Sequence, residues 1–229
     1  MKHQQTPRES MYMSRGVVCA AAVVLAGCAS VNKQPVSAGA KSELRDQRVA
    51  TTKRAVPDFA AMTAGKAAFA VLGALAMISE GNGIIARNKV ADPADAIAAG
   101  LVASLAGGYS ARAADQPVSV AVDDVAGVAT AANGAARFIV DVQTLNWSFG
   151  YFPSDWTHYR VIYTAKARLI DAQSKSVVAE GFCKQIPETN EGAPTYDELL
   201  AGQAALLKAR LAAAGEACLQ TLKAEMLSL

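Results

Sequence analysis

The sequence has few of the residues that most often carry chemistry. It contains only two histidines, His3 and His158, and His3 lies in a segment that we expect to be removed. A lone histidine on the predicted polar face of a strand gives little support for a metal site or a Ser-His-Asp triad. Gly-x-Ser-x-Gly, phosphate-loop and dinucleotide motifs are also missing. We therefore expect a protein that is not an enzyme and needs no metal and no cofactor.

Charge of one sign is also in short supply. Charged residues are 18% of the chain, and the net charge is only +2. Lys2, Arg8, Glu9 and Arg15 all precede residue 28, and the rest of the chain has 19 basic and 19 acidic residues. A neutral chain lacks the basic footprint of a nucleic-acid-binding protein and the polybasic patch that binds anionic lipid. Nucleic acid is therefore not an expected partner.

A long apolar run is missing from the body of the chain. The best candidate, residues 59–79, is rich in alanine but is interrupted by Lys66, and Gly81 and Gly83 follow it around an asparagine. Its purely apolar part is too short to span a bilayer, and the glycines are expected to end it. We predict a buried core helix here, with a self-associating face of small residues as the alternative.

The N-terminus does carry a recognisable pattern. Arg15 precedes an uninterrupted apolar run, residues 16–26, which has the length of a signal-peptide core rather than of a permanent span. The sequence predicts that residues 1–27 are a signal peptide. Translation could begin at Met1, Met11 or Met13, because each start leaves an adequate basic region.

Four residues at the end of this run resemble the lipobox of bacterial lipoproteins: Leu25, Ala26, Gly27 and Cys28. The resemblance implies a diacylglyceryl thioether on Cys28, cleavage just before it, and acylation, for example with palmitate, of the new amine. An ordinary secretory leader with a chance cysteine is the alternative. Ala29 follows Cys28, where lipoproteins kept in the inner membrane carry Asp, so the resemblance implies a lipid anchor at the periplasmic face of the outer membrane.

The rest of the chain divides into a polar segment and one domain. Residues 28–58 are rich in Ser, Gly, Gln, Pro and mixed charge. This composition predicts a lipidated N-terminus and tether, flexible over 30–42 and with a helical alternative over 42–55. Residues 59–229 are predicted to form a single periplasmic domain.

Alternation and capping signals predict the architecture of that domain. Apolar and polar side chains alternate over Tyr159–Leu169, and residues 176–186 follow as the hairpin partner. Thr195 and Glu198 match a capping box that opens a helix running to about Leu227. We expect an α+β fold with a small, mostly antiparallel sheet of about four strands. The long C-terminal helix and Ala-rich helices would pack on this sheet.

Two cysteines remain in the predicted domain, Cys183 and Cys218. Cys183 shares its strand face with Ala179 and Gly181, which would let a helix approach closely, and Cys218 lies on the apolar stripe of the last helix. Because the periplasm oxidises thiol pairs, we predict a disulfide between them, with two unpaired buried thiols as the alternative. On the chain-entropy model this bridge would stabilise the fold by roughly 4 kcal/mol.

Aromatic residues are only 6% of the chain, yet half of them fall between Trp147 and Tyr163. The predicted loop 148–157 and its border hold five candidate binding residues: Trp147, Phe149, Tyr151, Phe152 and Trp156. Rings on a rigid sheet are typical of recognition surfaces, although some must simply cap the core. The hypothesis is a non-enzymatic lipoprotein that binds another envelope component, a protein or a glycan such as peptidoglycan.

The order of predicted elements over residues 92–227 looks like that of several small envelope lipoproteins. These are the auxiliary lipoproteins of envelope ABC transporters, the lipoproteins that stimulate peptidoglycan synthases, and the N-terminal domain of the Tol system's propeller protein. The resemblance lies in layout and carries no residue motif, so it implies function only by analogy. An auxiliary transporter subunit and a self-assembling structural lipoprotein, a homo-oligomer built through residues 65–83 or the last helix, are the alternative functions.

Overall fold

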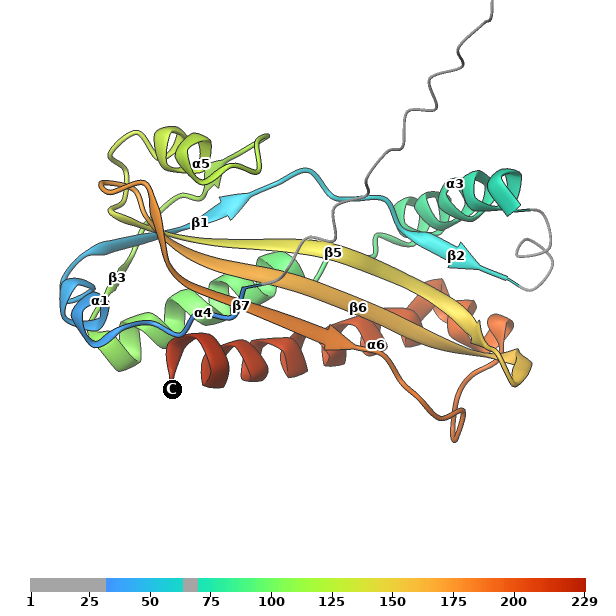
Figure 1. Cartoon of the computed structure of the whole chain (residues 1–229). Helices are drawn as coiled ribbons and strands as arrows, with labels where there is room; N and C mark the ends of the chain where they lie inside the picture. Colours follow the sequence, from blue (N-terminus) through green and yellow to red (C-terminus); the bar gives the residue numbers. More distant parts are fainter. Residues whose placement is uncertain (1–31, 64–69) are drawn as a thin grey trace, which may run out of the picture. The chain divides into compact units, whose positions relative to one another are not determined.

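The computed structural model describes residues 32–63 and 70–229, and within them the chain forms one mixed sheet with helices on both faces (Figure 1). The sheet has seven strands: β1 (Arg48–Lys53), β2 (Ala60–Met62), β3 (Arg112–Ala113), β4 (Val118–Ser119), β5 (Phe138–Phe152), β6 (Asp155–Asp171) and β7 (Ser176–Gln185). The helices are α1 (Ala38–Glu43), α3 (Ala70–Asn88), α4 (Ala94–Tyr109), α5 (Val125–Ala131) and α6 (Tyr196–Leu222), which continues into a π-helical turn (Lys223–Leu227).

The sheet corrects the fold prediction. Its main path runs β3-β1-β5-β6-β7, and only β5, β6 and β7 are antiparallel neighbours. β1 pairs in parallel with β3, β4 and β5, and β2 also pairs in parallel with β5. The expectation of about four mostly antiparallel strands is therefore wrong, although the α+β class fits. The error arose because the parallel strands are short and come from segments far apart in the sequence.

The expected tether contributes to the sheet instead. α1 and β1 both lie within residues 32–58, and β1 occupies a position inside the sheet with partners on both sides. Val49 and Ala50 are buried. Thr52 is buried too, and its hydroxyl is satisfied by donating a hydrogen bond to Asp141 Oδ1 at 2.8 Å. Polar composition misled the prediction, since pairing on both edges satisfies the backbone whatever the side chains are. Cys28 and the signal peptide lie outside the described residues.

The two faces of the sheet are covered unequally. α4 and α6 lie together on one face over the larger hydrophobic cluster, whereas the short α5 covers part of the other (Figure 1). Alternate residues of β6 from Tyr159 to Leu169 belong to the larger cluster, so the predicted inward face of this strand is confirmed. On β5 the alternation breaks at Leu145, which is bulged between the pairs Thr144–Ala165 and Asn146–Thr164.

The Ala-rich stretch is divided between a strand and a helix. β2 covers residues 60–62, and α3 runs through Gly81 and Gly83 to Asn88, so these glycines do not end the helix. Gly81 is required for another reason: a Cβ there would lie 2.0 Å from the Phe59 carbonyl oxygen, where β2 crosses the helix. Among the described residues, no helix is both long enough and apolar enough to cross a membrane.

The capping box at the start of α6 forms as predicted. Thr195 N donates to Glu198 Oε2 at 2.8 Å, and Glu198 N donates back to the Thr195 hydroxyl. The helix is interrupted one turn later, where Gly202, Gln203 and Ala204 all have φ between 56° and 61°. Beyond this left-handed turn α6 packs on β6 and β7 through a buried stripe: Leu207, Leu211, Gly215, Cys218 and Leu222.

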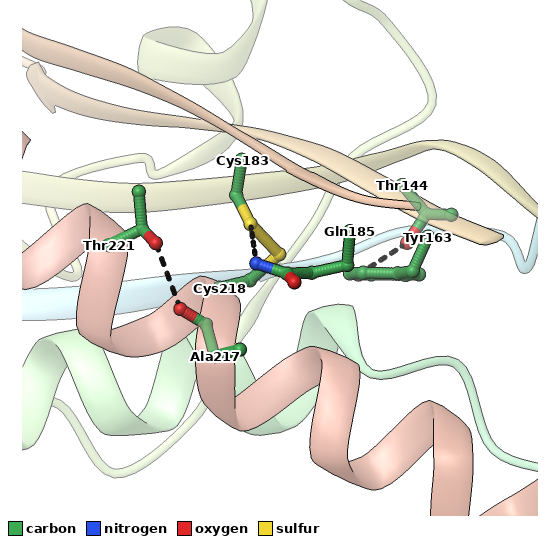
Figure 2. Close-up of a disulfide and its surroundings, with 7 residues drawn as sticks. All are labelled: Thr144, Tyr163, Cys183, Gln185, Ala217, Cys218 and Thr221. Carbon is green, nitrogen blue, oxygen red and sulfur yellow. Dashed lines mark hydrogen bonds between the residues drawn. A yellow bond between two sulfur atoms is a disulfide. The ribbon is translucent and has the colours of Figure 1, made fainter. Parts of the chain in front are cut away.

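The predicted disulfide is confirmed. Cys183 on β7 and Cys218 on α6 are bonded, with their Cα atoms 5.3 Å apart (Figure 2). Gly181 allows this approach, because a Cβ there would lie 2.7 Å from the Leu222 side chain. Figure 2 also shows the Gln185 amide, which donates to Cys183 Sγ at 3.6 Å. The bridge thus fastens the last helix to the edge of the antiparallel part of the sheet.

Candidate functional site

The five aromatic residues of the predicted binding loop divide into a buried group and an exposed pair. Trp147, Phe149 and Phe152 are buried, Tyr151 is half-buried, and Trp156 is 65% exposed. The expected loop 148–157 is mostly strand, because β5 continues to Phe152 and β6 begins three residues later. For the buried group, capping of the core is therefore the observed role.

The buried rings form one aromatic cluster beneath the start of α6. Phe59 meets Trp147 edge to face, with ring centroids 5.0 Å apart. The Phe149 ring centroid lies 5.9 Å from the ring centroids of both Tyr159 and Tyr196, and each pair meets edge to face. Such contacts add stability beyond the area they bury, so this cluster makes a rigid base for the end of the β5–β6 hairpin. We call residues 151–160 the hairpin end.

Trp156 is exposed because β6 leaves its ladder there. Tyr151 pairs with Tyr159 and Phe152 with Asp155, so the three residues 156–158 have no partner on β5. The backbone at residue 158 pairs instead with Thr195. The Trp156 ring stands 6.1 Å from the Tyr151 ring, and its indole N–H donates to the Pro153 carbonyl oxygen at 3.2 Å. One indole face is thus held outward by a fixed backbone.

Asp155 fixes the conformation of residues 156–158, which are unpaired with β5. Its Oδ1 accepts from the Thr157 amide at 3.1 Å and from the Thr157 hydroxyl at 2.7 Å. Its Oδ2 accepts from Asn190 Nδ2 at 2.8 Å and lies 2.6 Å from His158 Nδ1. Hydrogen bonds from Thr157 and Asn190 lower the pKa of Asp155 below its usual value, which means that the folded state favours the charged carboxylate. His158, expected to be simply solvated, is therefore held against this carboxylate.

A pocket of about 330 Å³ lies beside the hairpin end, between β6, the loop before α6, and α6 itself. Two arginines line it. Arg160 packs its guanidinium 5.2 Å from the Phe152 ring centroid and donates from one terminal nitrogen to the Pro187 carbonyl oxygen at 3.0 Å. Arg210, on α6, donates to the Gly192 carbonyl oxygen at 3.3 Å. The pocket therefore carries two positive charges and one negative charge, that of Glu191, on a largely apolar wall.

A larger cleft, about 680 Å³, opens where β1 ends and α4 begins. Both cations of its lining are neutralised within the fold: Lys53 pairs with Asp95, and Arg54 pairs with Asp141 at 2.7 Å. Asp141 is fully buried and also accepts from Arg168 at 2.6 Å. Burial by itself raises the pKa of Asp141, but the hydrogen bonds from the two arginines outweigh burial, and the net shift is downward.

The pKa of Asp92, which also lines this cleft, shifts in the opposite direction from that of Asp141. Asp92 Oδ1 accepts from the Thr144 hydroxyl and from the Ala94 amide, so it caps the first backbone N–H of α4. The Tyr163 hydroxyl lies 2.9 Å from the Thr144 oxygen and completes a chain of three polar groups. Burial raises the pKa of Asp92, because no cation of the described residues pairs with it. Nowhere in residues 32–63 and 70–229 do three His, Cys, Asp or Glu side chains gather as metal ligands would.

Two solved structures resemble the chain only distantly. No family model and no curated protein matches it. The chain is similar to the PelC dodecamer from Paraburkholderia phytofirmans, with 14% identity over 81% of this chain and 93% of that chain, at a TM-score of 0.33. It is also similar to the lipoprotein GNA1162 from Neisseria meningitidis, with 10% identity over 71% of this chain and 93% of that one, at a TM-score of 0.27. Likenesses at such scores carry no argument about function.

Sequence reasoning found the rings but missed the polar residues that position them. Asp155 and Thr157 form an Asp-x-Thr sequence, which is a signature of side-chain-to-backbone turns and could have indicated that residues 156–158 leave the ladder. Asn190, Arg160 and Arg210 gave no comparable signal, because only the fold brings the loop and α6 next to the hairpin end.

Proposed function

We propose that this chain is a lipid-anchored envelope protein without enzymatic activity, and that its hairpin end binds another envelope component, a protein or a glycan. The observation that carries the binding role is the exposed indole of Trp156 beside Tyr151, above a base of buried rings. A large ring held outward by a rigid support gives contact area at little entropic cost, and tryptophans of this kind are enriched at the centres of interfaces.

Support for the anchor comes from the sequence alone. The lipobox ending in Cys28 favours lipidation, and the absence of Asp after it favours the periplasmic face of the outer membrane. Several acyl chains would make the attachment effectively permanent. Cys28→Ala is expected to abolish labelling by a fatty-acid analogue and to leave an unprocessed precursor. Normal maturation of this variant would overturn the anchor, and co-migration with inner-membrane markers on a density gradient would overturn the sorting alone.

The binding role is tested by crosslinking in intact cells. A photoreactive amino acid at position 156 is expected to trap a partner, whereas the same group at Leu145, which is 49% exposed on the β5 bulge, is not. Trp156→Ala should reduce capture by a probe placed at Tyr151 without changing thermal stability. Equal capture from positions 156 and 145, or none from either, would contradict the proposal. A transporter protein among the captured partners would favour the auxiliary-subunit alternative.

Self-assembly is a second candidate with an observation of its own. Leu75 on α3 is 64% exposed, and Met62 on β2 is also exposed, at a short strand that pairs only with β5 among the described residues. An exposed apolar helix beside a sheet edge suits contact with a second copy. Sedimentation of the wild type and of Leu75→Glu tests this: a wild-type oligomer that Leu75→Glu dissociates would support it, and a monomeric wild type would exclude it.

A further inference from the structure

The two arginines of the pocket beside the hairpin end differ from the other buried or clustered arginines in lacking a counter-charge. Arg54, Arg112, Arg137 and Arg168 all form ion pairs with carboxylates. Among the described residues, neither Arg160 nor Arg210 has a carboxylate within ion-pair distance. The lining of the pocket also contains one carboxylate, Glu191, which forms no ion pair with either arginine, so the lining has a net charge of +1 (two arginines and one glutamate).

Most hydrogen-bonding capacity of these guanidinium groups is also unused. Each guanidinium offers five N–H donors. Arg160 donates one hydrogen bond to the Pro187 carbonyl oxygen, and Arg210 donates one to the Gly192 carbonyl oxygen. Arg160 Nε is buried and has no hydrogen-bond partner in the structure. A buried donor without a partner costs free energy, so an acceptor that reached Arg160 Nε would lower that cost.

The remaining wall is mostly apolar and contains small or rigid side chains. Val161, Ile186, Pro194, Ala213 and Ala214 line the cavity, with Gln185 and Thr189 as neutral polar groups and Glu191 as the one carboxylate. A sugar would leave many hydroxyl groups facing apolar atoms, and these would lose hydrogen bonds to water. A phosphate monoester carries about −1.5 to −2 charges near neutral pH, more than the net charge of +1 that Arg160, Arg210 and Glu191 give the lining. A planar carboxylate attached to small apolar groups fits both the charge and the surface, because guanidinium groups bind carboxylates in a bidentate fork.

We infer that this pocket binds the free carboxylate end of a peptide whose last residues carry small apolar side chains. The carboxylate lies between Arg160 and Arg210, and the terminal side chains lie against the alanines of α6. The cavity volume, about 330 Å³, is at the small end of the range for ligand sites and suits a chain end rather than a long segment. The inference rests on the proposed function, since it names the chemistry of a partner that binds at the hairpin end.

Calorimetry and NMR titration of the detergent-solubilised full chain test this with defined probes. The probes are L-Ala-L-Ala-L-Ala with a free carboxylate, the same peptide as its C-terminal amide, and the D-alanine tripeptide acid. We expect a peptide acid to bind with a Kd of about 1 mM or tighter and the amide at least tenfold more weakly. Preference for the L form assigns the ligand to protein C-termini, and preference for the D form assigns it to the stem peptides of the cell wall.

Two variants complete the test. Arg210→Gln removes an exposed guanidinium without disturbing the core and is expected to weaken binding of the acid about tenfold. Lys208→Gln is the matched control, because it removes one positive charge from the same helix outside this pocket and should leave binding unchanged. Equal binding of acid and amide, no binding of either acid, or equal loss in both variants overturns the inference. If Trp156-dependent crosslinks persist in cells despite that result, only the inference fails and the proposed function stands.

Discussion

A carboxylate lies on each face of the sheet, Asp141 buried and Asp92 half-buried, and the pKa values of the two shift in opposite directions. On the face partly covered by α5, Asp141 lies between Arg54 and Arg168, and its pKa is lowered. On the face covered by α4 and α6, Asp92 meets hydroxyl and amide groups but no cation of the described residues, and burial raises its pKa. One face is thus held together by charge as well as by a small apolar cluster, and the other by apolar contact and a disulfide. Removing each element separately tests this division.

The largest expected effect is loss of the disulfide that fastens α6. Cys218→Ser breaks a bridge between residues 35 apart, and should lower the free energy of unfolding by about 4 kcal/mol because the unfolded chain regains its loop entropy. Urea denaturation followed by circular dichroism measures the difference. The wild type in reducing agent should match the variant, and the Cys183→Ala/Cys218→Ala pair should lose no more than either change alone. A clearly smaller loss would show that apolar packing holds α6 unaided.

Next in size is the change that removes the carboxylate from the charged face. Asp141→Ala leaves the buried Arg168 guanidinium with only the exposed carboxylate of Asp123 as a counter-charge, which should cost about 3 kcal/mol; Arg54, being partly exposed, can turn to water. Thermal and urea unfolding provide the measurement.

Asp123→Ala is the matched control, because Asp123 also pairs with Arg168 but its side chain is 69% exposed, so its loss should cost less than about 1 kcal/mol. The folded-state pKa of Asp141 is lowered, so its stabilising contribution is present above the unfolded pKa near 3.8 and disappears as pH falls through the folded value. A penalty for Asp141→Ala that persists unchanged in strong acid would contradict the ionic account of this face.

A smaller, favourable effect is expected in α6. Gln203 is exposed and has φ of 61°, a left-handed conformation that costs a residue with a Cβ about 1–2 kcal/mol. Gln203→Gly relieves this strain but adds entropy to the unfolded state, so a net gain of about 0.5–1 kcal/mol is expected. Gly202→Ala, at φ of 58°, should destabilise the fold instead. Urea unfolding measures the stability of both variants. If both are less stable than the wild type, the turn is not left-handed in solution.

The smallest effect should come from Asp92→Asn, and its sign sharpens the comparison. The raised folded pKa means that ionisation of Asp92 costs more in the folded state, so the wild type loses relative stability as pH rises from the unfolded pKa through the folded one. Asparagine keeps the cap but cannot ionise. The stability of the variant relative to the wild type should therefore increase from acidic to neutral pH. The midpoints of urea unfolding measure this difference. An advantage for the wild type that grows with pH would place an unseen cation near Asp92.

The sequence predicted those parts of the fold that have a local pattern. The alternation along β6, the capping box at Thr195 and the pairing of Cys183 with Cys218 each follow from periodicity of a strand or helix. The parallel strands left no such pattern: β1 joins β5 across about ninety residues, and a six-residue polar segment gives no sign of a partner that distant. The buried rings could be identified by type, but their exposure depends on which strand face the bulge assigns them.

The bulge at Leu145 has the effect of a phase shift in a repeating signal. Before it, Val140 and Val142 point to the α4–α6 side, while Asp141 points to the other. One extra residue then places the odd positions Trp147 and Phe149 on the α4–α6 side, together with Val140 and Val142. The strand works like a reading frame with a single insertion: deleting Leu145 would remove the bulge and leave Asn146 paired with Thr164 and Trp147 with Tyr163, on the faces they have now. If the same fifteen residues ran without the bulge, Trp147 and Phe149 would instead share the face of Asp141, so the one residue without a partner keeps the strand in register with its core.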